Sequence, residues 1–223
     1  MSASRRLIAV ISKDLRSELR TRYGITALVL FVVTAIVLVV FAAADEPMPR
    51  PIAAAVLWVV MFYTAMTGLG RGFISEEERG TSLLLRLSTD PTSVYFGKLI
   101  VNIVQSVLSN LLAALLFLFF MSRVNVGNPT LLLLCVLAGS IGLASTLTIV
   151  SAIVAKAGSK SALLPILSFP VLLPLIMPGT DVMLSAFAGL AVAEVAGSLG
   201  LMVSYTGIVI VVSWFVFEYI WCE

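Results

Sequence analysis

The chain has 223 residues, of which 60% are apolar and only 12% are charged, and its mean hydropathy is +1.11. Soluble globular domains do not reach such values, so the composition indicates an integral membrane protein. The net charge of +2 is small and gives no indication of binding to nucleic acid.

Membrane-spanning helices are therefore the main elements to expect, and each needs about 20 mostly apolar residues. Six segments meet this requirement: residues 23–44, 51–72, 97–121, 130–155, 163–184 and 199–219. Segments of about ten residues with alternating polarity, which are typical of outer-membrane barrels, are absent. We expect an all-α integral membrane protein with six transmembrane helices in a single domain over residues 1–223.

The distribution of basic residues predicts the orientation of these spans. If the N-terminus lies inside, the cytoplasmic segments contain all Lys and Arg residues of the chain except Arg50 and Arg123. Cytoplasmic loops of membrane proteins carry an excess of Lys and Arg. Both termini should therefore lie in the cytoplasm.

Residues 1–22 precede the first span and are predicted to form an amphipathic helix. The apolar residues Leu7, Ile8, Ile11, Leu15 and Leu19 recur at helical spacing, while basic residues take other positions. We expect this helix to lie flat along the inner leaflet, with its basic side chains near anionic lipid headgroups. A specific lipid or protein site on this helix is the alternative.

A long polar interruption lies between the second and third predicted spans, over residues 73–96. The acidic residues 76–78 precede Gly80, and a glycine there suits the left-handed position that ends a helix. Further along, Asp90 followed by Pro91 is typical of the N-cap and first residue of a new helix. The interruption therefore contains two helix boundaries.

A short cytoplasmic helix is predicted between these boundaries, because Thr81 or Ser82 can cap the apolar residues 83–87. Such a helix could dock into a groove on a soluble partner and couple that partner to the spans. The candidate docking residues are Glu76, Glu77, Glu78, Gly80, Thr81, Ser82, Leu83, Leu84 and Leu87. The alternative is a helix that only lies on the lipid, since its leucines do not define a narrow face.

Polar and small residues in the third and fourth spans predict tight helix packing. Asn102, Gln105, Ser109 and Asn110 follow roughly one side of the third span and should face a neighbouring helix, because exposure to lipid is costly. The fourth span contains small residues suited to close helix contacts. These are Gly139, Ser140, Gly142, Ala144, Ser145, Thr146 and Ser151.

The fifth span contains four regularly spaced prolines, Pro165, Pro170, Pro174 and Pro178. Each proline removes a helical hydrogen bond, so we expect this span to be kinked or broken. Broken helices often mark transport pathways, and a bent packing helix is the alternative. Residues 180–200 follow and are expected to form a short helix at the outer surface.

The sequence lacks the residues of common catalytic and metal sites. It contains no histidine, only two cysteines and no Gly-Lys-Ser/Thr phosphate-binding loop. No metal ligands or catalytic residues are predicted. The chain is expected to depend on a partner for its energy source and not to be an enzyme itself.

The polar loop and its borders resemble the loop between spans two and three in permease subunits of the ABC-2 exporter type. The matching residues are Arg71, Phe73, Glu76, Glu77, Glu78, Gly80, Thr81, Ser82, Leu83 and Lys98. Within that group, the chain length, the absence of histidine and the proline-spaced LLPILSFPVLLPLIMPG resemble the CcmB family. One difference is Ser-Thr-Asp-Pro at residues 88–91, where the family tends to have Leu-Pro-Leu-Pro.

The resemblance implies a haem exporter membrane subunit of cytochrome c maturation, located in the bacterial inner membrane. Its implied partners are a CcmA-type ABC ATPase, a CcmC-type haem-handling protein and a small CcmD-type membrane protein. ATP would bind to the ATPase, haem could be handled through a partner, and no haem site is assigned to this chain itself. ATP hydrolysis would drive haem export or the release of a haem-loaded chaperone.

Two other functions suit the same sequence features. One is a generic ABC-2-type exporter of a lipid, drug or glycan, which would use the same spans and loop. The other is a non-transporting membrane scaffold that a partner ATPase moves. The proline-spaced fifth span favours cytochrome c maturation over the generic exporter.

Overall fold

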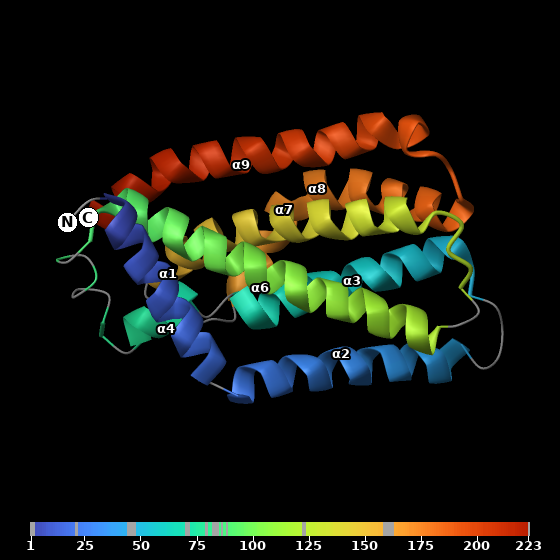
Figure 1. The fold of residues 1–223 in the computed structure, drawn as a ribbon, viewed down its shortest axis with the longest axis horizontal. Helices are drawn as coiled ribbons and strands as arrows, with labels where there is room; N and C mark the ends of the chain where they lie inside the picture. Colours follow the sequence, from blue (N-terminus) through green and yellow to red (C-terminus); the bar gives the residue numbers. More distant parts are fainter. Residues whose placement is uncertain are drawn as a thin grey trace.

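The computed structural model describes residues 3–20, 22–43, 48–69, 72–78, 80, 81, 85, 87, 89–121, 124–157 and 163–222. The regular elements in these ranges are all helical (Figure 1). They are α1 (Ala3–Arg20), α2 (Arg22–Ala43), α3 (Arg50–Leu69), α4 (Gly72–Glu78), α6 (Pro91–Phe120), α7 (Pro129–Lys156), α8 (Leu163–Ala188), the 3-10 helix η1 (Val192–Val195) and α9 (Ala196–Cys222). α1 begins and α9 ends at the end of the bundle where α4 lies, which we call the α4 end.

Five helical segments are long and apolar enough to cross a membrane. They are Arg50–Ile74, Pro91–Phe120, Pro129–Lys156, Leu163–Ala188 and Val192–Trp221. In α2, the apolar helical stretch found within the described residues, Val29–Val39, is shorter than such a span. The prediction of an all-helical, multi-pass membrane protein is thus confirmed.

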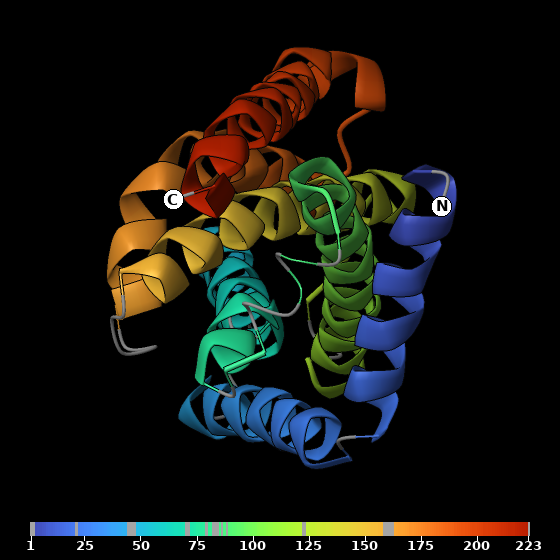
Figure 2. The ribbon, with the colours of Figure 1, turned by 90° about the vertical axis from the view of Figure 1, so that its left-hand side faces the viewer.

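α7 lies in the middle of the bundle and contacts α3, α4, α6, α8 and α9 (Figure 2). Its small residues are buried as the sequence predicts, and they allow close approach of neighbouring side chains. A Cβ atom added to Gly139 of α7 would lie 2.8 Å from the ring of Trp58, and one added to Gly179 of α8 would lie 2.1 Å from it. Trp58 of α3 is therefore wedged between two glycines.

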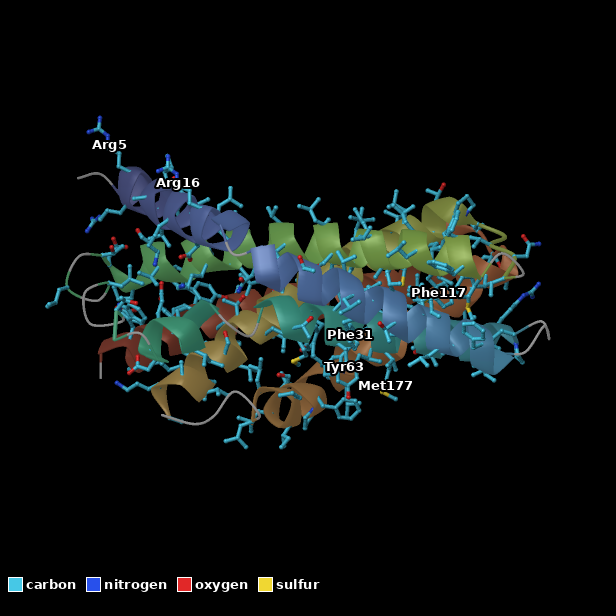
Figure 3. The ribbon with its side chains drawn as sticks, turned by 90° about the horizontal axis from the view of Figure 1, so that it is seen from below. Arg5, Arg16, Phe31, Tyr63, Phe117 and Met177 are labelled. Carbon is cyan, nitrogen blue, oxygen red and sulfur yellow. The ribbon has the colours of Figure 1, made fainter. Side chains whose placement is uncertain are left out.

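α1 packs against α6, so it does not simply lie free along the membrane. Val10 of α1 is 3% exposed, and a Cβ atom added to Gly97 of α6 would lie 2.8 Å from Val10 Cγ1. Ile8 and Leu15 of the predicted apolar face are exposed, which leaves them free to contact lipid, while Leu7 and Ile11 are half-buried. The expected contact of this face with the inner leaflet stays a prediction. Figure 3 shows Arg5 and Arg16 pointing away from the bundle.

α8 is a continuous helix despite its prolines, so this span is not broken, and the expected kink stays a prediction. The hydroxyl of Tyr205 in α9 donates a hydrogen bond of 2.7 Å to the carbonyl oxygen of Val171, three residues before Pro174. A neighbouring helix thus supplies a donor to a carbonyl of α8 in the turn that precedes a proline.

The prediction of a separate surface helix over residues 180–200 is wrong. α8 extends through Ala188, and after a turn and η1, α9 already begins at Ala196. The carboxylate of Asp181 accepts a hydrogen bond of 2.6 Å from Ser198, so two polar residues that interrupt the apolar pattern satisfy each other across the two helices.

The end of the bundle opposite α4 is closed by a contact between two backbone segments. A Cβ atom added to Gly127 would lie 2.5 Å from the Cα atom of Gly189, and Gly189 has a φ of 87°. The amide of Asn128 donates to the Ala186 carbonyl at 2.9 Å, and its side chain donates to the Leu190 carbonyl at 2.8 Å. The α6–α7 and α8–α9 connections are thereby joined.

Candidate functional site

The acidic helix α4 ends as the sequence predicts, at a glycine with left-handed backbone conformation. Gly80 has a φ of 67°, and its amide donates to the Glu77 carbonyl at 3.0 Å. The amide of Thr81 donates to the Glu76 carbonyl at 3.0 Å, which completes a Schellman motif. The chain therefore turns sharply after α4.

Beyond this turn, two backbone hydrogen bonds have the spacing of an α-helix. The amide of Leu85 donates to the Thr81 carbonyl at 3.2 Å, and the amide of Thr89 donates to the Leu85 carbonyl at 3.1 Å. Leu87 is 80% exposed, whereas Leu85 packs against the core. The predicted docking residues Ser82, Leu83 and Leu84 lie outside the described residues.

Asp90 caps the next helix, as predicted from the Asp-Pro pair. Its carboxylate accepts a hydrogen bond of 3.0 Å from the Ser93 amide and pairs with Arg6 of α1 at 3.1 Å. Desolvation raises the pKa of Asp90, but the hydrogen bonds from Ser93 and the charge of Arg6 outweigh it, so the pKa lies below its usual value. This cap fixes the point where α6 begins.

The acidic residues of α4 do not all face the same way. Glu77 is exposed, while the side chain of Glu76 is only 12% exposed and turns toward α6. Nothing is described of the side chain of Glu78. Of the predicted docking residues that are described, Glu77, Gly80, Thr81 and Leu87 are exposed, and Glu76 is occupied inside the protein.

Glu76 belongs to a charge cluster centred on Lys98 of α6. The Lys98 side chain is 3% exposed, and its Nζ lies 3.1 Å from Glu76 Oε2 and 3.2 Å from Asp14 Oδ2 of α1. Lys98 also donates to the Gly72 carbonyl at 3.4 Å and lies 4.8 Å from the centre of the Phe73 ring. One ammonium group thus contacts both α1 and α4. We call Asp14, Glu76, Lys98 and the neighbouring Lys13 the Lys98 cluster.

Lys13 forms the outer part of this cluster. It pairs with Asp14 at 3.1 Å and donates a hydrogen bond to the inner Glu76 carboxylate. Partial burial lowers the pKa of Lys13, but the hydrogen bond to Glu76 and the charges of Asp14 and Glu76 outweigh it and raise the pKa above its usual value of 10.5. The two carboxylates are therefore each shared between two lysines.

The sequence prediction missed the part that α1 plays here. It placed Lys98 at the border of the loop and assigned no role to Asp14. A usable signal was present, because Asp14 lies at helical spacing from Leu7, Val10 and Ile11. An acid on the side of a helix that carries apolar residues indicates a buried partner of opposite charge.

A small pocket lies beside the cluster, between α4 and the ends of α7 and α9. It is lined by Phe73, Glu76, Glu77, Ala152, Ala155, Lys156, Phe217, Ile220 and Trp221. Its volume of about 20 Å³ corresponds to about one water molecule, which is too small for an organic ligand. The ring centroid of Phe73 lies 5.5 Å from that of Phe217, so α4 is also packed against α9.

The four prolines of α8 do not line a space inside this chain. Pro170 and Pro174 are exposed, Pro165 and Pro178 are half-buried, and Pro165 lies in the first turn, where no helical hydrogen bond is lost. In contrast, Leu172 and Leu175 between them are fully buried. The predicted pathway along these prolines would therefore run along the outside of this chain.

Two of the four polar residues predicted to face a neighbouring helix, Asn102 and Asn110, pair with α7, whereas Ser109 donates to carbonyls of α6 itself. Asn102 donates to the Thr148 hydroxyl at 2.8 Å, and Asn110 donates to the Ser140 hydroxyl at 3.1 Å. Ser106 donates to the Ser140 carbonyl at 3.0 Å. These contacts, which we call the α6–α7 seam, continue the line of polar contacts that starts at Lys98.

Comparison with known families gives one match that covers nearly the whole chain. The sequence profile of the family described as CcmB protein matches residues 5–219. The chain belongs to the CcmB family. Proteins of the CcmB family are permease subunits of the haem exporter of cytochrome c maturation, so this CcmB chain is a membrane transport subunit. No relative among curated proteins matches it.

Proposed function

We propose that this chain couples ATP hydrolysis by a partner ABC ATPase to haem export, or to the release of a haem-loaded chaperone, in cytochrome c maturation. The CcmB match over residues 5–219 is the observation that carries this proposal. The CcmA-type ATPase, the CcmC-type haem-handling protein and the CcmD-type small protein are the proposed partners. ATP binds to the ATPase, and haem is cargo handled with a partner.

The docking site for the ATPase consists of the exposed residues after α4. The Schellman turn at Gly80 directs the chain away from α4, and Leu87 presents an apolar side chain that is 80% exposed. Glu77, near the end of α4, is also exposed and can contact the same partner. An exposed leucine on a short helical segment suits insertion into a groove on a soluble protein.

The proposed orientation places the α4 end in the cytoplasm of a bacterium, with the chain in the inner membrane. Arg5, Arg16 and Lys156 lie at the α4 end, whereas Arg50 begins α3 at the opposite end. This distribution follows the positive-inside rule. α2 serves as the sixth span in this arrangement, since its 22 residues correspond to a helix about 33 Å long.

The docking proposal is tested by two substitutions at Leu87. Leu87→Asp should abolish co-purification of the ATPase and cytochrome c maturation, because a charge cannot enter an apolar groove. Leu87→Trp separates docking from lipid contact: tryptophan is well suited to the membrane interface but too large for a groove shaped for leucine. Ile8→Asp on α1 is the matched control, because Ile8 is also an exposed apolar residue at the α4 end.

If Leu87→Asp leaves both ATPase co-purification and maturation intact, the docking site is wrong. If Leu87→Trp behaves like the unchanged chain while Leu87→Asp is defective, the segment lies on lipid and does not dock. Ile8→Asp should retain the ATPase in amounts similar to those of the unchanged chain.

A second candidate function is coupling without conduction, in which this chain transmits the movement of the ATPase but does not by itself form a passage for haem. The α6–α7 seam favours this candidate. Asn102, Ser106 and Asn110 use their polar groups on α7 and so do not line a passage. Native membranes solubilised in mild detergent should yield the chain with an ATPase and a haem-binding maturation protein. A Soret band that disappears when the haem-binding protein is removed supports coupling without conduction. Recovery of an ATPase without any maturation protein would point to a generic exporter.

A further inference from the structure

Lys98 links α4 to the spanning helices through a buried ammonium group. A buried ammonium group is stable only while its carboxylate and carbonyl partners stay in place, because removing them leaves a desolvated, unpaired charge. Its partners are Glu76 and the Gly72 carbonyl of α4 and Asp14 of α1, all within 3.4 Å. When α4 is displaced, either Lys98 moves with it or the ammonium group is separated from Glu76 and the Gly72 carbonyl, which is unfavourable.

α1 is held against α6 in a single register by two ion pairs. Arg6 pairs with Asp90 at 3.1 Å, and about two helical turns further along both helices Asp14 pairs with Lys98 at 3.2 Å. α1 supplies the basic residue, Arg6, in the first pair and the acidic residue, Asp14, in the second. Between them, Val10 lies against Gly97, where a Cβ atom would approach to 2.8 Å. α1 and the start of α6 therefore move together.

We propose that Lys98 is the positioning residue that transmits movement of α4 to α6 and α1. This inference rests on the proposed function, in which the ATPase docks on the segment that follows α4. When the ATPase displaces that segment, Glu76 and Gly72 move with α4, and the buried ammonium group draws α6 and α1 along. α6 passes the displacement to α7 through the Asn102–Thr148 hydrogen bond of 2.8 Å. Lys98 acts in this step without touching the ATPase.

The test compares Lys98→Met with the double variant Asp14→Asn/Lys98→Met. The single variant leaves the Asp14 and Glu76 carboxylates with Lys13 alone, so it should be less stable. The double variant removes one positive and one negative charge and keeps the Lys13–Glu76 pair, so its melting temperature in detergent should return toward that of the unchanged chain. Both variants lack the ionic links from Lys98 to α1 and α4 and keep the Arg6–Asp90 pair.

Three quantities are measured for each variant: the melting temperature, the amount of co-purified ATPase with its ATP hydrolysis, and the yield of mature cytochrome c. We expect both variants to retain the ATPase and its hydrolysis, and the yield of cytochrome c to fall at least tenfold in both. Lys98→Arg, which keeps the charge, should restore most of the yield. Arg16→Met is the matched control, because it removes an exposed basic side chain that points away from the bundle at the same end, and its yield should not change.

Recovery of both melting temperature and cytochrome c yield in the double variant would overturn the proposal, because Lys98 would then have only a structural role. Loss of the ATPase from either Lys98 variant would also overturn it, since Lys98 would then shape the docking surface itself. Absence of an ATPase from the unchanged chain would overturn the proposed function, and this inference with it.

Discussion

At the α4 end, the start of α6 is held by charges, whereas about one turn further along the same helix its polar contacts are neutral. Lys98 is buried between Asp14 and Glu76, while Asn102 and Asn110 form hydrogen bonds with hydroxyl groups of α7. Beyond these contacts, the spanning region depends on close packing, most clearly where Trp58 fits between Gly139 and Gly179.

The difference between charged contacts at the α4 end and neutral contacts in the span follows from the access of water to each region. Near the surface, Lys13 completes the Lys98 cluster with an exposed charge, so the carboxylates retain contact with solvent. Within the span, charges would be far more costly, and hydrogen bonds between helices each contribute only about 0.6 kcal/mol on average. Close packing therefore dominates in the span, whereas at the α4 end ion pairs add to the packing of Val10 on Gly97.

The largest expected effect is loss of the close packing in the span. Gly179→Ala should lower the free energy of unfolding by about 3 kcal/mol, the upper end for overpacked sites, because its Cβ would lie 2.1 Å from the rigid Trp58 ring. Thermal unfolding in detergent measures this loss. Gly207→Ala is the matched control, since a Cβ there would meet no atom within 4 Å. Equal stability of the two variants would contradict the packing argument.

A smaller loss is expected when one carboxylate of the Lys98 cluster is neutralised. Asp14→Asn weakens a charged hydrogen bond of 3.2 Å but leaves Lys98 paired with Glu76, so the loss should be about 2 kcal/mol. The same unfolding experiment measures it. In the Lys98→Met background, Asp14→Asn should instead be stabilising, and additive losses in the two backgrounds would show that the two residues do not interact.

The neutral hydrogen bonds of the α6–α7 seam should be weaker still. Asn110→Leu removes donors to Ser140 and Ser106 and fills the same space with an apolar side chain, so the loss should be about 1 kcal/mol or less. Asn110 Oδ1 is buried without a hydrogen-bond partner, which reduces the loss further. If Asn110→Leu lowers the free energy of unfolding by more than Asp14→Asn does, the α6–α7 seam is not weaker than the Lys98 cluster, and this prediction is wrong.

The pH dependence of stability should be the smallest effect and should be confined to the charged end. Because the pKa of Lys13 is raised in the folded protein, its contribution is complete below pH 10.5 and is lost as the pH rises above that value. The difference in melting temperature between the unchanged chain and Lys13→Met should therefore shrink above pH 10.5. A difference that stays constant across this range would exclude Lys13 as the titrating group.

Local signals in the sequence predicted the helix boundaries around the loop well. Gly80 and the Asp90–Pro91 pair each determine a boundary through their own backbone or side chain, and both have the predicted geometry. The Lys98 cluster could not be predicted in this way. Asp14 and Lys98 are 84 residues apart in sequence, and only the packing of α1 on α6 brings them together.

Two predictions around the fifth span show what the local sequence leaves out. The prolines of α8 predicted a kink or a break, and the helix continues, with Tyr205 of α9 donating a hydrogen bond to the Val171 carbonyl. A separate helix was expected over residues 180–200, but α8 runs on through Ala188, and Ser198 of α9 satisfies the carboxylate of Asp181. In both cases the partner lies on a neighbouring helix, which the local sequence cannot show.

The backbone contact between Gly127 and Gly189 gives the bundle a fixed pivot. No side chain lies between the two glycine backbones that could change its rotamer, and the hydrogen bonds of Asn128 join the same two connections. When α4 is displaced, the opposite end of the bundle should therefore stay in place. Displacements of α6, α7 and α8 should be greatest beside Lys98 and should diminish along the helices toward Gly127.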